Sequence, residues 1–240
     1  MTTVDGSRAS SPSPGEGRSG GVAELVRQAA QDAIARLDLA PVAAAAAALA
    51  PRVAAGGLLH VLGAGHSQLL ALEGFYRAGG PGWLHPLYDA RLSTARGVRV
   101  TTYERSAGLG AELVSGLDAG GALLVVSSSG RNAVPVEAAE AAAAAGLLTI
   151  AITSRGPGNR LAAAVAHVLD SAVPPGDAVV PVGAARMAPV STVAGAVLLH
   201  ALLAETESRL GGANVLISNN VEGGDAHNAA LIARYPHLAP

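Results

Sequence analysis

The sequence predicts an α/β protein in which helices alternate with the strands of a mostly parallel, doubly wound sheet. Two stretches carry this prediction, Leu58–Leu62 and Ala122–Val126, because each is a short, continuous apolar run. Such runs are typical of strands that are buried on both faces of a parallel sheet. Each run breaks into small residues and then continues into a segment with helical spacing. The repeated order of strand, turn and helix favours the doubly wound class.

Composition narrows the possible functions. The 240 residues suffice for one sizeable α/β domain, and the low aromatic content of 2 % means that Ala, Val and Leu must build its core. A net charge of −2 gives no indication of a nucleic-acid surface. The chain contains no cysteine and no lysine, which excludes disulfides, thiolate metal sites, cysteine nucleophiles and Schiff-base chemistry. We expect a cytoplasmic protein that uses no metal and no cofactor.

We expect residues 1–20, which are rich in Ser and Gly, to be a disordered leader, and residues 21–240 to form one domain. Two helices open the domain, and a polar tail that includes Asp225, His227 and Asn228 closes it. No membrane span is expected, because prolines interrupt the longest apolar stretch, 39–60. The expected helices are 22–37, 42–55, 68–78, 109–117, 133–145, 190–210 and short turns at 161–164 and 229–235; the expected strands are 58–62, 83–88, 98–103, 122–126, 147–152, 167–170 and 178–182.

Two turns that follow the first and the central strand have the composition of an anion site. They are Gly63–Ser67 and Ser127–Asn132, and each joins a strand to the start of a helix. Backbone N–H groups point out of a helix N-terminus, where the helix dipole favours negative charge. Serine hydroxyls add further donors. An ordinary Gly/Ser-rich loop is the simpler interpretation, but two such turns at strand–helix junctions favour a phosphate cradle.

These residues resemble the sugar isomerase (SIS) family of phosphosugar-binding domains, over roughly 58–210. The matching motifs are Gly63-Ala-Gly65-His66-Ser67, Ser127-Ser-Ser129-Gly130-Arg-Asn132, Ala151-Ile-Thr153-Ser154 and Ser191-Thr192. The tail is similar to that of a stand-alone bacterial subfamily. The resemblance implies a flavodoxin-like three-layer sandwich that dimerises through its helices. It also implies that the protein acts on phosphorylated sugars as an aldose–ketose isomerase, an etherase or a deaminase, or that it is a regulatory sensor of them.

By this resemblance, the phosphate should be held by Ser67, Ser127, Ser128, Ser129 and Asn132, the last of which stands where the family usually has Thr. The rest of the substrate should contact Gly65, Arg131, Thr153 and Ser191. Two catalytic residues of the family are missing. Arg77 occupies the position of the catalytic glutamate of its heptose isomerases and etherases, and the position of the isomerase histidine lies near Gly195, where this chain has no histidine.

Four residues are candidates for acid–base catalysis. Glu73 lies seven residues after His66, so on a continuous helix the two side chains would share a face, although an ion pair with Arg77 is the plainer alternative. His66 lies inside the first turn, where it can orient substrate or carry a proton. Glu104 follows the expected strand 98–103, and the ends of strands present ligands in α/β sheets, although a surface ion pair with Arg105 is an equal alternative. His227 belongs to the polar tail, for which two interpretations are equal: it reaches the site of a neighbouring subunit, or it is a solvated loop that caps itself.

We therefore expect an enzyme that acts on a hexosamine 6-phosphate, for example N-acetylglucosamine 6-phosphate. Glu73 or Glu104 would remove the C2 proton, and loss of the C3 substituent would follow, as in a dehydratase. The missing histidine disfavours an aldose–ketose isomerase, which is the first alternative. A non-catalytic sensor is the second. The expected partner is a small sugar phosphate, within at least a homodimer.

Overall fold

A computed structural model describes residues 21–239, so the leader expected over residues 1–20 lies outside the described part. Five parallel strands form the central sheet in the order β2-β1-β3-β4-β5. Their bounds are β1 Leu59–Gly63, β2 Leu84–Pro86, β3 Ala122–Val126, β4 Leu148–Thr153 and β5 His167–Asp170. This is the α/β doubly wound sheet that the alternating pattern predicts, and the prediction is confirmed.

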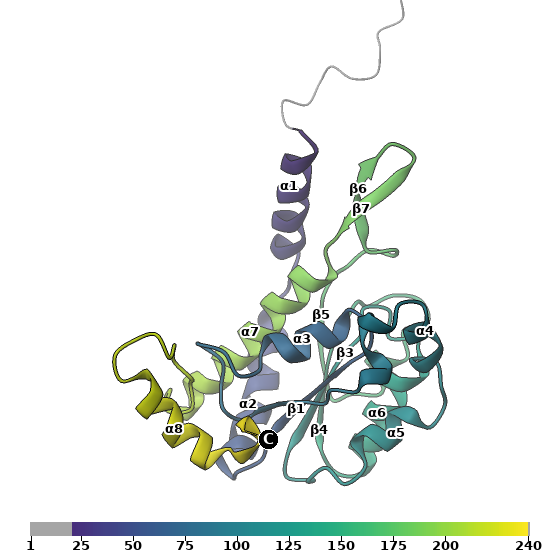
Figure 1. Cartoon of the computed structure of the whole chain (residues 1–240). Helices are drawn as coiled ribbons and strands as arrows, with labels where there is room; N and C mark the ends of the chain where they lie inside the picture. Colours follow the sequence, from purple (N-terminus) through teal and green to yellow (C-terminus); the bar gives the residue numbers. More distant parts are fainter. Residues whose placement is uncertain (1–20, 240) are drawn as a thin grey trace, which may run out of the picture.

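Helices cover both faces of the sheet, which gives the predicted three layers (Figure 1). One face packs against α2 (Ala40–Ala54), α3 (Ser67–Glu73) and α7 (Ser191–Leu210), through side chains such as Leu49, Leu70 and Leu198. The other face packs against α5 (Leu109–Val114) and α6 (Ala133–Ala144). Val125 of β3 faces this second layer, whereas Leu124 faces the first, as the twofold period of a strand requires.

Shorter elements complete the chain. The 3₁₀ turns are η1 Ala90–Leu92, η2 Thr94–Arg96, η3 Leu161–Ala163 and η4 Pro236–Leu238, and the remaining helices are α1 Val22–Ala35, α4 Arg99–Tyr103 and α8 Gly224–Arg234. Among the described residues no single helix is long and apolar enough to cross a membrane; only α1 and α2 taken together pass that test, with a bend of 63° between them.

The expected strand over 98–103 is wrong, because this segment forms the helix α4. The alternation of Val98 and Val100 suggested a half-buried strand, but Val98 is 86 % exposed. A strand also needs an edge to pair with, and the outer edge of β2 is already covered. There, Pro81 forms a bridge with Val215, and the His237 ring donates to the Leu84 carbonyl oxygen.

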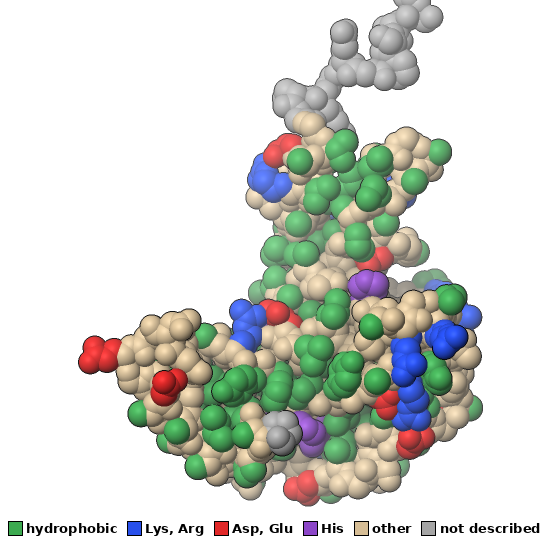
Figure 2. All heavy atoms as spheres, viewed as in Figure 1, with side chains coloured by type: hydrophobic (Ala, Val, Ile, Leu, Met, Phe, Trp, Pro, Cys, Tyr) green, Lys and Arg blue, Asp and Glu red, His purple; other side chains and the backbone are tan. Residues whose placement is uncertain are grey.

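A hairpin and a helix extend away from the sheet together and form an arm (Figure 1). The hairpin pairs β6 (Ala178–Val182), the weak strand of the prediction, with β7 (Ala185–Pro189), which the sequence pattern missed. The helix is α1, whose Ala33 packs against Val173, Val190 and Ala194. Figure 2 shows that apolar side chains also cover much of the visible surface of the arm.

A buried carboxylate fastens the end of the chain to the domain. Glu207 of α7 is only 5 % exposed, and it accepts hydrogen bonds from the Trp83 indole at 2.7 Å and from the backbone and side-chain N–H groups of Asn214 at 2.9 Å. Tyr235 in turn donates to Asn214 at 2.8 Å. This network joins α7, the segment before β2 and the C-terminal segment.

We expect Glu207→Ala to lower the free energy of unfolding by about 3 kcal/mol or more, because it leaves several buried donors without an acceptor. Glu205→Ala is the matched control, since Glu205 forms a surface ion pair with Arg209 and should contribute less than about 1 kcal/mol. Urea unfolding measures both values. Equal losses in the two variants would contradict a structural role for the buried network.

Three histidines meet at the β1–β2 edge of the sheet. The Nδ1 atoms of His60 and His85 lie 3.1 Å apart, and the rings of His85 and His237 have centroids 5.2 Å apart. Burial lowers the pKa of His60 to about 4, and the neighbouring imidazoles of His85 and His237 act in the same direction. The Asp118 carboxylate has the opposite, smaller effect. The folded protein therefore keeps this ring neutral under mildly acidic conditions.

Acid should destabilise the fold through His60. The unfolded chain binds a proton near pH 6.5, whereas the folded chain does so only near pH 4. This contribution to stability is fully present above pH 6.5 and is lost as the pH falls toward 4. Between pH 7 and pH 5 we expect a loss of about 2 kcal/mol that is absent from His60→Leu. Urea unfolding at both pH values tests this, and equal losses in the two proteins would contradict it.

Candidate functional site

The order of the strands places a crevice between β1 and β3. From β1 the chain crosses to β2 on one side, whereas β4 and β5 follow β3 on the other side. Open α/β sheets bind ligands at such a switch point, beyond the carboxyl ends of the strands. The turns Gly63–Ser67 and Ser127–Asn132 leave the sheet at this place, because β1 and β3 are direct neighbours with Gly63 beside Val126.

The first turn is tight. A Cβ atom on Gly63 would lie 2.3 Å from the Ser67 carbonyl oxygen, so only glycine fits there. Gly65 has a φ of +59°, and its N–H donates to the Leu92 carbonyl at 2.8 Å. His66 is exposed just before α3, and Ser67 is its first helical residue. The turn therefore presents the Ser67 side chain while it uses the Gly65 N–H internally.

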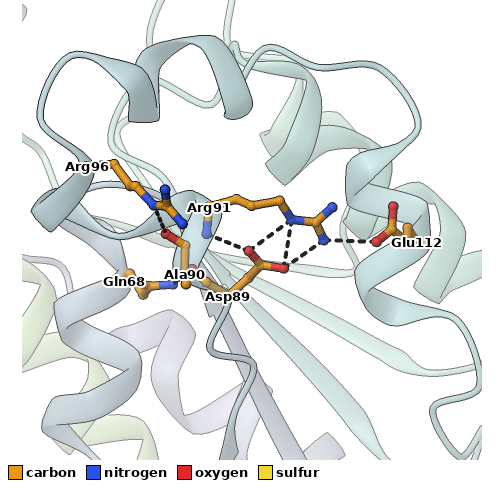
Figure 3. A network of polar contacts seen from close by, with 6 residues as sticks. All are labelled: Gln68, Asp89, Ala90, Arg91, Arg96 and Glu112. Carbon is orange, nitrogen blue, oxygen red and sulfur yellow. Dashed lines mark hydrogen bonds and ion pairs between the residues drawn. The ribbon is translucent and has the colours of Figure 1, made fainter.

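The loop after β2 holds this turn in place (Figure 3). The buried Gln68 side chain donates to the Asp89 carbonyl at 2.9 Å. Arg91 bridges the carboxylates of Asp89 and Glu112, which ties the loop to α5. Hydrogen bonds from Arg91 lower the pKa of Asp89 below its ordinary value, so its carboxylate stays charged.

The second turn is fixed from the neighbouring loop. Gly130 has a φ of +58°, and a Cβ atom there would lie 2.1 Å from the Asn159 side-chain oxygen. The Gly130 N–H donates to the Ser127 hydroxyl at 3.3 Å. Asn132 is the N-cap residue of α6, a helix of 12 residues whose N-terminus favours anions at the crevice.

A cavity of about 210 Å³ lies between the two turns. It brings together all five residues expected to bind phosphate, and Glu104 is the only carboxylate among its lining residues. The lining consists of Ala64, Ser67, Glu104, Val126, Ser127, Ser128, Ser129, Asn132 and Pro135. A small adjoining hollow is lined by His66, Ser67, Ser128 and Ser191 among others. Neutral hydroxyl and amide groups therefore surround one ionisable carboxyl group.

Glu104 reaches this cavity from the end of α4 rather than from a strand end. Its carbonyl accepts the N–H of Val134 at 3.1 Å, which anchors it to the first turn of α6. Burial raises the pKa of the Glu104 carboxyl above its ordinary value, although the Arg105 charge and a hydrogen bond with the Asn132 side chain oppose the rise. A carboxylate in such a setting is a stronger base than a solvated one.

Glu73 lies outside the set of residues that line the cavity. His66 and Glu73 stand at the two ends of α3 (Ser67–Glu73), and their spacing of seven positions separates the two by about 10 Å along the axis even on one face of the helix. The Glu73 carboxylate pairs with Arg77 and lies 3.4 Å from Nε2 of His200. It is 42 % exposed, so it has the surface ion pair that the sequence offered as the alternative.

The structure places the other predicted residues in supporting positions. Thr153 is fully buried and accepts a hydrogen bond from Asn159 at 2.8 Å. The Ser191 hydroxyl donates to Asp177 at 2.6 Å. Arg131 is exposed and donates to the Pro157 carbonyl at 2.6 Å. These contacts hold the loops around the cavity in position.

The tail forms α8, where Nε2 of His227 hydrogen-bonds the Val215 carbonyl oxygen at 2.9 Å. His227 is not among the residues that line the serine cavity of this subunit. Two residues that position the loops, Asn159 and Asp177, were missed. The signal for both is the glycine that precedes each of them in the sequence, Gly158 and Gly176. Both glycines have positive φ values, which are typical of turns.

Comparison with known proteins agrees with this geometry. The model of the SIS domain matches residues 24–154. A UPF0309 protein of Listeria monocytogenes is 36 % identical over 215 residues, which cover 82 % of this chain and 87 % of that protein. A UPF0309 protein of Brucella anthropi is 34 % identical over 217 residues, with 82 % and 90 % covered.

Two solved structures share the fold. A phosphoheptose isomerase from Neisseria gonorrhoeae aligns with a TM-score of 0.51 and 23 % identity, over 77 % of this chain and 94 % of that one. The Vibrio vulnificus NanR protein, complexed with ManNAc-6P, aligns with a TM-score of 0.57 and 15 % identity, over 88 % of this chain and 69 % of that one. From its matching motifs, its sheet order and these relatives, the chain belongs to the SIS-domain family of phosphosugar-binding proteins.

Proposed function

We propose that this protein is an enzyme that binds a sugar phosphate between the two turns and transfers a proton at C2 with Glu104. One observation carries the proposal: the Glu104 carboxyl, whose pKa is raised by burial, lines the same cavity as the serine hydroxyls. A site that only held phosphate would have no need of a basic carboxylate beside it. A non-catalytic sensor is therefore the weaker alternative.

In the proposed mechanism, the hydroxyls of Ser67 and Ser127–Ser129 and the Asn132 amide hold the phosphate. The sugar binds in its open-chain form, so that the C1 carbonyl makes the C2 proton acidic. The Glu104 carboxylate removes this proton, and the electron pair moves onto the carbonyl oxygen as an enolate. Partial burial raises the pKa of the Glu104 carboxyl, which makes the carboxylate a stronger base for this step.

Two products can follow from the enolate. With an aldose phosphate, the O2 proton passes to the enolate oxygen at C1, and the protonated Glu104 returns its proton to C1 as the C2 carbonyl forms, which gives a ketose phosphate. With a 2-acetamido sugar, the enolate expels the C3 hydroxyl, which leaves as water after it receives a proton. His66 lines the adjoining hollow and is the candidate donor. This elimination on a hexosamine 6-phosphate is the reaction that the sequence favours, and isomerisation is the second candidate.

Mass spectrometry and NMR of a panel of hexose and hexosamine 6-phosphates distinguish these outcomes. A loss of 18 mass units, the mass of water, identifies elimination, and constant mass with a new sugar identifies isomerisation. Glu104→Gln serves as the negative control. Tight binding of a sugar phosphate without any conversion or exchange of its C2 hydrogen would contradict the enzyme proposal and favour a sensor.

We also expect the protein to form at least a homodimer. Four apolar side chains of the arm, Val22, Val26, Ile34 and Met187, are between 42 and 59 % exposed. A second copy that packed on them would remove this apolar surface from water. Light scattering at micromolar concentration should give twice the chain mass of 23.6 kDa or more. A mass of one chain would contradict the expectation.

A further inference from the structure

A second cavity, of about 310 Å³, adjoins the serine cavity. The two share Ser128 and Ser129, so a molecule seated on the second turn can extend into both. Its walls are the loop after β4 and the loop that leads from β5 into the hairpin. Its lining residues are Ser128, Ser129, Arg131, Ser154, Arg155, Gly156, Pro157, Asn159, Val173, Pro174, Pro175, Gly176 and Asp177.

Most polar side chains of this cavity are already engaged with the protein. The Asp177 carboxylate accepts the N–H groups of Val190 and Ser191 at 2.9 and 2.8 Å, so the N-terminus of α7 compensates its charge. The Ser154 hydroxyl donates to the Val173 carbonyl at 2.6 Å. The Asn159 side chain donates to Thr153 and accepts from the backbone of Ala162. These groups maintain the walls of the cavity.

Two guanidinium groups remain for a ligand. Arg131 uses one N–H on the Pro157 carbonyl. The Arg155 guanidinium makes no hydrogen bond or ion pair to any residue within 21–239, while its backbone N–H is anchored to Asp170 at 3.2 Å. A guanidinium group offers five N–H donors, so both arginines have donors to spare. The cavity therefore carries positive charge, whereas no arginine lines the serine cavity.

We infer that this second cavity binds a second anionic group of the substrate. The inference rests on the proposed function, because it assigns the first phosphate to the serine cavity. The ligand class is a sugar phosphate that carries another phosphate or a carboxylate. Guanidinium groups bind both anions through paired, charge-assisted hydrogen bonds. Val173, Pro174 and Pro175 line the same cavity, so an apolar part of the ligand would have a surface to pack on beside the two guanidinium groups.

Calorimetry with the full chain tests this inference with three probes. Glucose 6-phosphate has one anionic group, glucose 1,6-bisphosphate adds a phosphate, and 6-phosphogluconate adds a carboxylate. We expect at least one of the last two to bind about tenfold or more tightly than glucose 6-phosphate. Arg155→Ala should abolish that gain and leave the affinity for glucose 6-phosphate within about twofold. Arg209→Ala is the control, since Arg209 pairs with Glu205 at the far end of α7 and should change neither affinity.

The probe that shows the gain identifies the second group as a phosphate or a carboxylate. If glucose 6-phosphate binds and neither doubly anionic probe binds more tightly, the inference is contradicted while the proposed function stands. Equal weakening of all three probes by Arg155→Ala also contradicts it, because it would mean a general effect on the site. N-acetylglucosamine 6-phosphate is titrated in parallel. If it binds and none of the three probes does, the inference is contradicted while the proposed function stands; if it does not bind either, the proposed function fails, and this inference fails with it.

Discussion

Glu104→Gln is expected to slow the exchange of the C2 hydrogen of a bound sugar phosphate with deuterated water by about 10²–10⁴-fold. Glutamine keeps the shape of the side chain and its capacity to hydrogen-bond, but it cannot accept a proton. Phosphate affinity should stay nearly constant, because the serines and the Asn132 amide remain in place. NMR of the C2 position in deuterated water measures the exchange rate, and calorimetry measures the affinity.

Glu73→Gln is the matched control for this prediction. Glu73 pairs with Arg77 and His200 outside the cavity, so the variant should exchange the C2 hydrogen at the rate of the parent protein. If Glu73→Gln stops the exchange and Glu104→Gln does not, the base is Glu73. The catalytic site would then have to include the outer end of α3, for example through a partner subunit.

Loss of the serine hydroxyls should give the second large effect. Ser67→Ala and Ser129→Ala each remove one hydrogen bond to a charged phosphate, which contributes about 1.5–3 kcal/mol. We therefore expect each variant to bind a hexosamine 6-phosphate about 10- to 150-fold more weakly in calorimetry.

Neither variant should unfold more easily, because both side chains lie at the cavity and Ser129 is exposed. Ser208→Ala is the control, since Ser208 lies on the exposed face of α7 and should leave the affinity unchanged. If the serine variants retain the parent affinity, the phosphate does not bind between the two turns.

The positions of the two turns were predictable from the sequence because their signals are local. A continuous apolar run followed by Gly and Ser identifies a buried strand and its turn, and parallel strands bring such turns to one edge. The five phosphate candidates meet at the cavity for this reason. The structure adds why glycine is needed at positions 63 and 130, where a Cβ atom would overlap the neighbouring backbone or the Asn159 side chain.

The assignment of the base depended on features that are not local. His66 and Glu73 stand about 10 Å apart along the axis of α3, so a shared helix face does not bring Glu73 to the cavity. The helix also ends five residues before the expected Ala78, ahead of a positive φ at Tyr76. The segment 98–103 alternates like a strand, but it does not pair with the outer edge of β2. Residues more than 100 positions away in the sequence contact that edge instead. Glu104 nonetheless reaches the cavity, because the Val134 N–H holds its backbone.

A crystal structure with a bound hexosamine 6-phosphate tests the central claim most directly, since it locates the phosphate. The account predicts phosphate oxygens within hydrogen-bonding distance of the Ser67 and Ser127–Ser129 hydroxyls, with C2 of the sugar facing the Glu104 carboxylate. Another cavity, of about 250 Å³, is lined by Tyr76, Arg77 and Ser218 among others. A phosphate found there, or anywhere away from the serines, would contradict the account.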